Sequence, residues 1–338
     1  MSNTNWDRTK RKIQFTGNST YSVSLPKEWV QTHQICRSDP VSIYHNHDRL
    51  VIAPERILDE PSCLKIEPQQ RSTDVVLQRI KAGFTAGYNQ IIVTDPTEID
   101  DRLRYRIHAT VESLIGMEIY EETEERIEIR DHLDASALSI SQSLAQLRQC
   151  ALRMQQDAME AVKTNNQTLA EWVRERDDQA DRQFAFISRE FHRGLTDITE
   201  LEILNIDRTE GFRYYKIARQ LERVADRAER VADVANQQPR SPGKDISQAL
   251  TQAVSLAREI VEHATTDEGT RALTRYHELL GHIDAGNEAI MRRADAHGHL
   301  YVVVLESARR TAEYGLNIVN IGTEGSVSDL LGPSSEQE

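Results

Sequence analysis

Four basic side chains lie within five residues near the start of the chain: Arg8, Lys10, Arg11 and Lys12. Basic side chains that neutralise backbone phosphates supply much of a protein's affinity for DNA. Arginine and asparagine side chains also read base edges in a groove, and Arg8, Arg11 and Asn18 are the candidates for that role. The sequence therefore predicts a DNA-binding site at these five residues. The alternative is a basic edge strand whose charge only prevents aggregation.

The distribution of charge favours the DNA-binding interpretation. The chain of 338 residues has 41 basic and 54 acidic side chains and a formal net charge of −13. Residues 1–56 nevertheless carry eight basic against five acidic side chains, so a basic head precedes an acidic remainder. Such asymmetry is typical of a segment that meets a polyanion. An acidic chain that is poor in lysine also suits a halophilic protein.

A row of acidic side chains follows one face of a predicted helix, at Glu222, Asp226, Glu229 and Asp233. Pairs of carboxylates four residues apart can bind a hard or borderline cation, and acids on the preceding helix (Glu175, Asp177, Asp178 and Asp181) could complete its shell. The neighbouring arginines provide a second explanation, because Asp226 can pair with Arg223 or Arg230 in a salt-bridge network that needs no metal. We prefer the second explanation. A divalent metal ion at these four acids is the one candidate cofactor.

Catalytic motifs are absent from the sequence. It contains no P-loop and no GxSxG, GxGxxG or HExxH pattern, and its three cysteines are far apart. We predict that the protein is not an enzyme. No apolar stretch is long enough for a membrane span, and the first residues lack the apolar core of a signal peptide, so a cytoplasmic protein without membrane insertion is expected.

Hydrophobic periodicity divides the chain into three kinds of structure. Residues 1–58 are predicted to form short strands, beginning with Lys12 to Thr16, and one short helix after Pro26. Residues 62–133 alternate between strand and helix in the order βαβαββ, which indicates a small α/β domain. Its role cannot be inferred from the residues.

The remainder is predicted to be helical. Apolar residues recur three and four positions apart in three helices over residues 136–237, and the pattern repeats over residues 245–322. A stretch around Pro239-Arg240-Ser241-Pro242-Gly243 separates the two three-helix units. Residues 325–338 are predicted to be a disordered tail.

The head resembles the AbrB/SpoVT family of DNA-binding domains. The resemblance rests on Arg11 to Trp29, which reads RKIQFTGNSTYSVSLPKEW, and on Ser38-Asp39-Pro40-Val41, where the family usually has Gly-Asp-x-Val. It implies a small swapped-hairpin β-barrel built by two chains, and therefore a homodimer. Ser38 departs from the family pattern because glycine is usual at that position.

The helical part resembles PhoU domains. Leu221 to Ala228, LERVADRA, is similar to the third-helix signature of that family, and Ala308 to Gly315 occupies the equivalent place in the second unit. The resemblance implies that acidic E/DxxxD pairs hold metal clusters. The second unit departs from this pattern, because Arg309 stands where the first acid is expected.

Together the two resemblances imply an archaeal PhoU-type phosphate uptake regulator with an AbrB-like DNA-binding head. The expected architecture is a β-barrel head, an α/β middle domain and tandem all-α three-helix bundles. The expected function is DNA-binding transcription regulation linked to phosphate homeostasis, with a phosphate transporter or signalling protein as a further partner. The alternative function is that of an adaptor that does not bind DNA and regulates phosphate transport through protein partners, its head serving only to dimerise.

Overall fold

The structure is a computed structural model of the whole chain. The residues that it describes are 9–16, 20–46, 49–54, 62–68, 72–95, 99–132, 139–196, 200, 204, 206–266, 268–293, 296–322 and 326–327. Arg8, Asn18 and most of the predicted tail lie outside these residues. The chain divides into two compact units, Met1–Pro61 and Ser62–Glu338.

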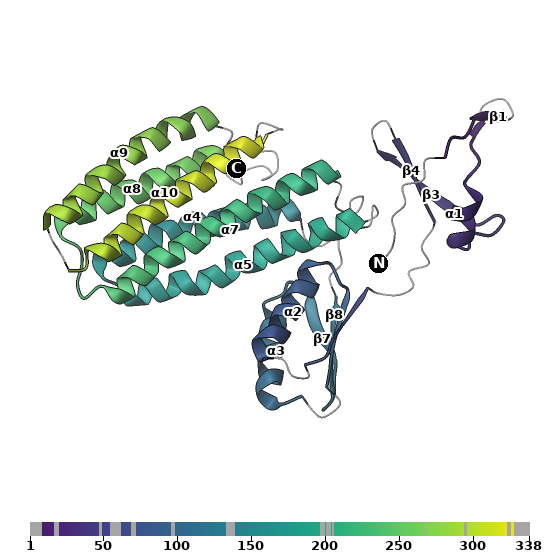
Figure 1. The fold of residues 1–338 in the computed structure, drawn as a ribbon, viewed down its shortest axis with the longest axis horizontal. Coiled ribbons are helices and arrows are strands. Elements are labelled where there is room, and N and C mark those ends of the chain that lie inside the picture. Colours follow the sequence, from purple (N-terminus) through teal and green to yellow (C-terminus); the bar gives the residue numbers. More distant parts are fainter. Residues whose placement is uncertain are drawn as a thin grey trace, which may run out of the picture. The chain divides into compact units, whose positions relative to one another are not determined.

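The first unit consists of two antiparallel hairpins and one short helix (Figure 1). Strand β1 (Gln14–Thr16) pairs with β2 (Thr20–Ser22), and β3 (Val41–Asn46) pairs with β4 (Arg49–Pro54). Helix α1 (Lys27–Thr32) follows Pro26, whose fixed backbone angle suits the start of a helix. The predicted hairpins and helix are confirmed, although β1 begins two residues later than expected, so that Lys12 precedes it.

Apolar side chains of the first unit are exposed within a single chain. Ile13, Phe15, Tyr21, Val23, Ile43 and Leu50 are each at least half exposed. Among the described residues of this unit, no hydrophobic side chain is buried. Four short strands cannot cover their own apolar residues, as expected for so small a unit.

The backbone at Ser38 explains the glycine that is usual there. Ser38 has φ of 77°, in the left-handed region that favours glycine, within a turn in which the backbone nitrogen of Cys36 donates to Asp39. We expect Ser38→Gly to raise the free energy of unfolding by roughly 1 kcal/mol at fixed protein concentration. Ser42→Gly, in the extended strand β3, should instead lower it. Chemical denaturation of both variants tests this, and equal effects would contradict it.

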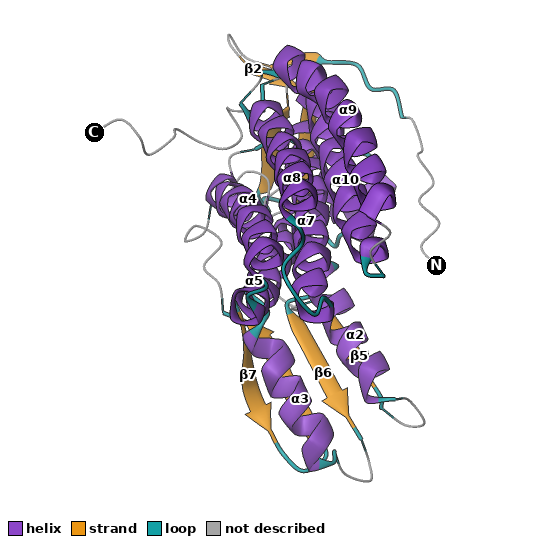
Figure 2. Ribbon diagram, turned by 90° about the vertical axis from the view of Figure 1, so that its left-hand side faces the viewer, coloured by secondary structure: helices purple, strands orange, loops and turns teal. Residues whose placement is uncertain are grey.

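The second unit begins with a two-layer α/β segment. Strands β5 (Cys63–Ile66), β6 (Gln90–Thr94), β7 (Met117–Glu122) and β8 (Arg126–Asp131) form a sheet in the order β5-β6-β8-β7. The pair β5 and β6 is parallel and the other two pairs are antiparallel. Helices α2 (Thr73–Thr85) and α3 (Asp101–Glu112) cover one face of this sheet (Figure 2). The predicted βαβαββ order is thereby confirmed.

Six long helices follow in the described residues after residue 139. They are α4 (Ile140–Thr164), α5 (Gln167–Thr196), α7 (Arg208–Gln237), α8 (Lys244–Thr265), α9 (Gly269–Arg293) and α10 (Gly298–Gly322). Side chains at their starts support the boundaries: Ser139 and Asp207 accept hydrogen bonds from backbone nitrogens of the first turns of α4 and α7. No helix in the described part of the chain is both long and apolar enough to cross a membrane.

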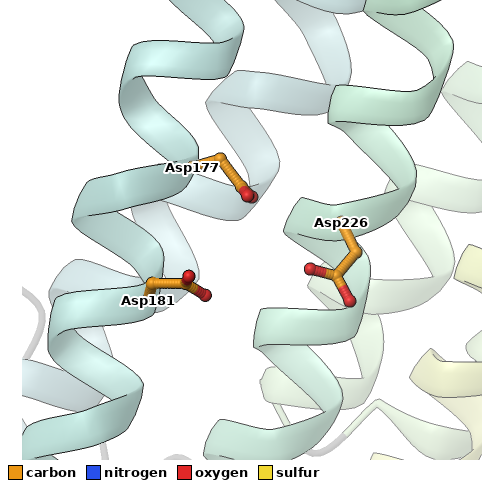
Figure 3. A group of neighbouring side chains, drawn as sticks. All are labelled: Asp177, Asp181 and Asp226. Atoms are coloured by element: carbon orange, nitrogen blue, oxygen red, sulfur yellow. The ribbon is translucent and has the colours of Figure 1, made fainter. Parts of the chain in front are cut away.

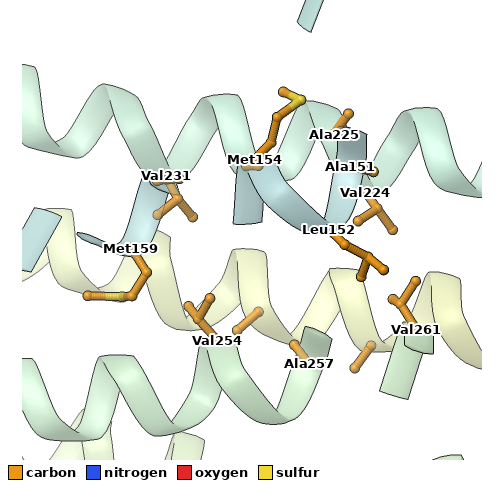
Figure 4. Packing of buried hydrophobic residues seen from close by; sticks show 14 of the residues in the cluster. Ala151, Leu152, Met154, Met159, Val224, Ala225, Val231, Val254, Ala257 and Val261 are labelled. Atoms are coloured by element: carbon orange, nitrogen blue, oxygen red, sulfur yellow. The ribbon is translucent and has the colours of Figure 1, made fainter. Parts of the chain in front are cut away.

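One hydrophobic core runs through both three-helix units. Side chains of α4, α7 and α8 meet in it, including Met154, Val224 and Val254 (Figure 4). Gln155 crosses the core, because its amide nitrogen donates to the carbonyl of Val224 on α7 at 2.7 Å and to the hydroxyl of Thr311 on α10 at 3.1 Å. A buried amide that is satisfied by two other helices fixes their mutual register.

A buried arginine joins the α/β segment to α5. Arg189 is fully buried, and its guanidinium donates to the carbonyls of Phe84 and Tyr88, both at 2.9 Å, beside the end of α2. It also donates to the carboxylate of Asp131 on β8 at 2.6 Å. Arg193, one turn later, donates to the same oxygen of Asp131 at 3.1 Å. The α/β segment is therefore anchored on α5 by charged hydrogen bonds as well as by apolar contacts.

Candidate functional site

Three carboxylates converge between α5 and α7. One oxygen from each of Asp177, Asp181 and Asp226 lies within 4.8 Å of the others. Asp177 and Asp181 are one turn apart on α5, and Asp226 faces them from α7 (Figure 3). We call these three residues the carboxylate cluster.

The sequence places this cluster at the edge of the helix contact. On α7, Leu221, Ala225 and Ala228 are buried in the core, so Asp226 lies beside the packed stripe. On α5, Val173 and Ala180 are buried and bracket Asp177 in the same way. Alanine is a small residue, and it stands in the packed stripe of each helix, at Ala180 on α5 and at Ala225 and Ala228 on α7. These small side chains let the two helices approach closely, so their carboxylates come together.

Basic side chains offset the like charges in the cluster only at longer range, Arg219, Arg227 and Arg223 acting on Asp226 and Lys81 and Arg219 acting on Asp181. Within the described residues, no ion pair of 4.0 Å or less involves Asp177, Asp181 or Asp226. The expected pairing of Asp226 with Arg223 or Arg230 is therefore not formed. One carboxylate oxygen of Asp177 is shielded from solvent and has no hydrogen-bond partner, and the same holds for one oxygen of Glu222.

Burial raises the pKa of each of these acids, and repulsion by neighbouring carboxylates adds to the rise for all of them except Asp226. Burial, together with the charges of Asp181, Glu229 and Asp226, raises the pKa of Asp177 to about 7. Burial and the charge of Asp226 raise the pKa of Glu222 to about 7. The pKa values of Asp181, Asp226 and Glu229 are also raised, in each case first by burial.

Arginines hold the outer acids of the predicted row. Asp233 accepts a hydrogen bond from Arg174 at 2.7 Å, and Glu229 lies 3.8 Å from the same guanidinium. Glu222 accepts a hydrogen bond from Arg219 at 3.0 Å. Of the four acids predicted as metal ligands, Asp226 is thus the one that the structure places in the carboxylate cluster, with Glu222 and Glu229 as its charged neighbours. Salt bridges with Arg219 and Arg174 hold the two ends of the row. Asp226 at its centre forms no ion pair with a described residue, and Arg219, Arg227 and Arg223 act on its charge only at longer range.

The second three-helix unit lacks an equivalent cluster in its described residues. Arg309 stands at the position of Glu222 and donates to Glu313 at 2.5 Å and to Glu306 at 2.6 Å. Arg310 donates to the same two acids, at 3.0 and 3.1 Å. Glu313, the counterpart of Asp226, is therefore neutralised by two arginines.

The carboxylate cluster has the donor chemistry of a divalent cation site. Carboxylate oxygens are the ligands that hard cations such as Mg²⁺, Mn²⁺ and Ca²⁺ prefer, and the remaining positions of such ions are filled by water. A cation at the cluster would neutralise the repulsion that raises the pKa values, and the unpartnered oxygen of Asp177 would gain a partner. The residues present therefore fit a divalent metal ion held by Asp177, Asp181 and Asp226.

The raised pKa of Asp177 predicts a specific dependence of stability on pH. Between its ordinary value of 3.8 and the raised value of about 7, the folded chain keeps a proton that the unfolded chain releases. The contribution of this group to stability is therefore full below pH 3.8 and is lost as the pH rises through 7. Asp177→Asn removes the ionisation, so its Tm relative to that of the wild type should increase from pH 5 to pH 8 in the presence of a chelator. A constant difference in Tm would contradict the shift.

The basic residues of the head are exposed. Lys10, Arg11 and Lys12 lie in an irregular segment before β1, and none of them forms an ion pair with Glu28 or with another described residue. Arg8 and Asn18, the other two predicted DNA contacts, lie outside the described residues, as does Asp7. Three basic side chains are thus available in solvent next to the exposed apolar strands.

Comparisons with known proteins find similarities to two parts of the chain. Residues 144–235 match the family model of the PhoU domain, and residues 14–58 match that of "Antidote-toxin recognition MazE, bacterial antitoxin". No curated protein matches the chain. Among solved structures, PhoU from Pseudomonas aeruginosa is similar over 54% of this chain and 92% of that chain, with 20% identity and a TM-score of 0.44. The chain therefore carries a MazE/AbrB-like domain at residues 14–58 and a PhoU domain at residues 144–235.

Proposed function

We propose that this chain is a cytoplasmic, homodimeric DNA-binding regulator of phosphate homeostasis. Its head binds DNA, and its PhoU domain binds a divalent cation and contacts a phosphate transporter or signalling protein. The observation that carries the proposal is the exposed segment Lys10-Arg11-Lys12, which has no described acidic partner and precedes a MazE/AbrB-like fold. The PhoU domain at residues 144–235 supports the link to phosphate.

The exposed apolar residues of the head support the homodimer. Phe15 and Tyr21 lie on paired strands with ring centroids 5.1 Å apart, and both are more than half exposed. A second chain that added its own hairpins would cover such residues and complete a barrel. The same arrangement would place two copies of Lys10, Arg11 and Lys12 on one assembly, which doubles the number of phosphate contacts.

DNA binding is tested by fluorescence anisotropy with genomic fragments across a salt series. Two copies of Arg8, Lys10, Arg11 and Lys12 supply up to about eight phosphate contacts, so log K should fall with log salt with a slope of about −7. Replacing Lys10, Arg11 and Lys12 by alanine leaves about two contacts and should flatten the slope to about −2. The matched control replaces Lys65, Arg79 and Lys244 by alanine, which removes the same charge from exposed positions outside the head.

The outcomes separate the two functions. A steep slope in the wild type and the control, with a flat slope in the head variant, supports a DNA-binding head. Equal slopes in all three proteins, or no binding by a folded wild type at low salt, contradict it. The adaptor function, with the head as a dimerisation device, would then be the better description.

A further inference from the structure

Five charged side chains lie together where the α/β segment meets α5, and we call them the interface cluster. They are two bases and three acids: Arg189, Arg193, Asp131, Glu190 and Glu200. Each of these side chains is at most 17% exposed. With every group ionised, the cluster has one more negative than positive charge. A buried charge in excess is costly, so the cluster is sensitive to the protonation of its acids.

The two arginines hold Asp131 and Glu200 closely and leave Glu190 with the weakest contacts. Arg189 and Arg193 donate to the same oxygen of Asp131 at 2.6 and 3.1 Å. Arg193 also donates to Glu200 at 2.5 Å. One oxygen of Glu190 lies 4.0 Å from Nε of Arg189 and 3.8 Å from Nη1 of Arg193, and both distances exceed that of a hydrogen bond. The Nε atom of Arg189 is shielded from solvent and has no hydrogen-bond partner.

The charges that act most strongly on Glu190 belong to the interface cluster. Burial, which favours the neutral form, raises the pKa of Glu190. The positive charges of Arg193 and Arg189 on α5 oppose the rise, and the negative charges of Glu200 and of Asp131 on β8 add to it. Helices α2, α4 and α7 also pack against α5, but their described residues form no ion pair with Glu190.

The same two arginines contact the turn between α2 and β6. Arg189 donates to the carbonyls of Phe84 and Tyr88, both at 2.9 Å. Gly87, which lies between them, has φ of 89°, and a Cβ atom at this position would be 2.8 Å from Cγ of Arg193. The turn therefore lies directly against both arginines. A change in what the arginines bind changes the contact between the α/β segment and α5.

We propose that Glu190 competes with Asp131 for the two arginines, so that uptake of a proton by Glu190 strengthens the attachment of the α/β segment to α5. When Glu190 is neutral, two guanidinium groups face two carboxylates and the charges of the interface cluster balance. When Glu190 is ionised, its carboxylate draws Arg189 and Arg193 away from Asp131 and from the turn.

The direction of the pH dependence follows from linkage. In the attached state Glu190 keeps its proton above 4.5, the ordinary pKa of a glutamate, whereas in the detached state it releases the proton at that value. The contribution of Glu190 to the attachment is therefore full below pH 4.5. It is lost as the pH rises through the raised pKa of Glu190.

The experiment measures hydrogen-exchange protection of residues 84–89 in the full-length chain between pH 5 and pH 8. Protection factors, which are corrected for the intrinsic effect of pH on exchange, should fall as the pH rises. The fall due to Glu190 is at most about tenfold per pH unit, because one proton is released. Glu190→Gln cannot ionise, so its protection at pH 8 should exceed that of the wild type and should depend much less on pH.

The matched control is Glu175→Gln, at an exposed position of the same helix, and it removes the same formal charge. It should retain the pH dependence of the wild type. A second variant, Glu200→Gln, removes the other acid that Arg193 contacts, and it should retain the fall as well.

Several results would overturn the proposal. Constant protection of the wild type from pH 5 to pH 8 does so without any variant. An unchanged fall in Glu190→Gln shows that another group titrates. Loss of the fall in Glu200→Gln but not in Glu190→Gln assigns the titration to Glu200. Equal effects of Glu190→Gln and Glu175→Gln show a response to net charge alone.

Discussion

Replacing Arg189 by methionine is expected to destabilise the α/β segment by about 3–5 kcal/mol, because the buried carboxylate of Asp131 loses its hydrogen bond from Arg189 while it keeps the longer one from Arg193, and two buried carbonyls lose their donor. Arg189 is fully buried, and Asp131 accepts hydrogen bonds from both Arg189 and Arg193. The carbonyls of Phe84 and Tyr88 would lose a buried donor in the same substitution. Methionine keeps most of the side-chain volume, so the loss measures polar contacts and not a cavity.

The measurement is urea denaturation followed by circular dichroism, together with hydrogen exchange of β8. Arg182→Met, at an exposed position of the same helix, is the control and should change stability by less than about 0.5 kcal/mol. The double variant Arg189→Met with Asp131→Asn should be less destabilised than the sum of the single variants, because both single variants lose the same bond between Arg189 and Asp131. Strict additivity would show that the two groups do not interact.

Replacing Asp226 by asparagine is expected to weaken Mn²⁺ binding on the order of 100-fold, since the number of charged ligands largely sets the affinity of such sites. Asp226 is the one member of the carboxylate cluster on α7, and the other two members lie on α5. Its loss therefore removes the link between the two helices as well as one charge. The wild type should gain about 2.7 kcal/mol of stability at a Mn²⁺ concentration of 100 times Kd, and the variant should gain little.

The tandem repeat provides the control for this prediction. Glu313 occupies the place of Asp226 in the second unit but is neutralised by Arg309 and Arg310. Glu313→Gln removes the same formal charge and should leave Mn²⁺ affinity unchanged. Equal losses in both variants would show that the ion responds only to the overall charge, and the assignment of the site to α5 and α7 would be wrong.

Local patterns were sufficient to predict the elements of this fold. The spacing of Ile140, Leu144, Leu147 and Ala151 predicts α4, and all four side chains are at most 5% exposed. The alternation of strand and helix predicts the order βαβαββ, because each element has its own periodicity. What local patterns could not predict is which elements face each other across long stretches of sequence.

The carboxylate cluster illustrates this limit. The spacing on one helix identifies Asp226, and Asp177 and Asp181 are among the acids of the preceding helix that could complete a metal shell. The salt bridge between Arg174 and Asp233 joins residues 59 positions apart, so no local spacing shows that Asp233 is already neutralised. The cluster itself likewise joins Asp226 to residues of another helix, so its existence depends on a contact between helices that spacing along one helix does not show.

The role of Arg189 is hidden from local patterns for a related reason. It stands three residues after the buried Phe186 and therefore on the same face of α5, which faces the protein interior. This helical spacing is the sequence signal that indicates the burial of Arg189. Its hydrogen-bond acceptors lie far away in the sequence: the carbonyl of Tyr88 is 101 residues earlier, that of Phe84 is 105 residues earlier, and Asp131 is 58 residues earlier.

The exposed apolar strands of the head have a genetic consequence. If each barrel takes hairpins from two chains, a cell that produces wild-type chains and chains lacking Lys10, Arg11 and Lys12 will contain mixed dimers. A mixed dimer keeps only half of the phosphate contacts, and affinity falls steeply with their number. Such a head variant should therefore act as a dominant-negative allele, whereas a variant of the carboxylate cluster leaves the DNA-binding surface of its partner intact.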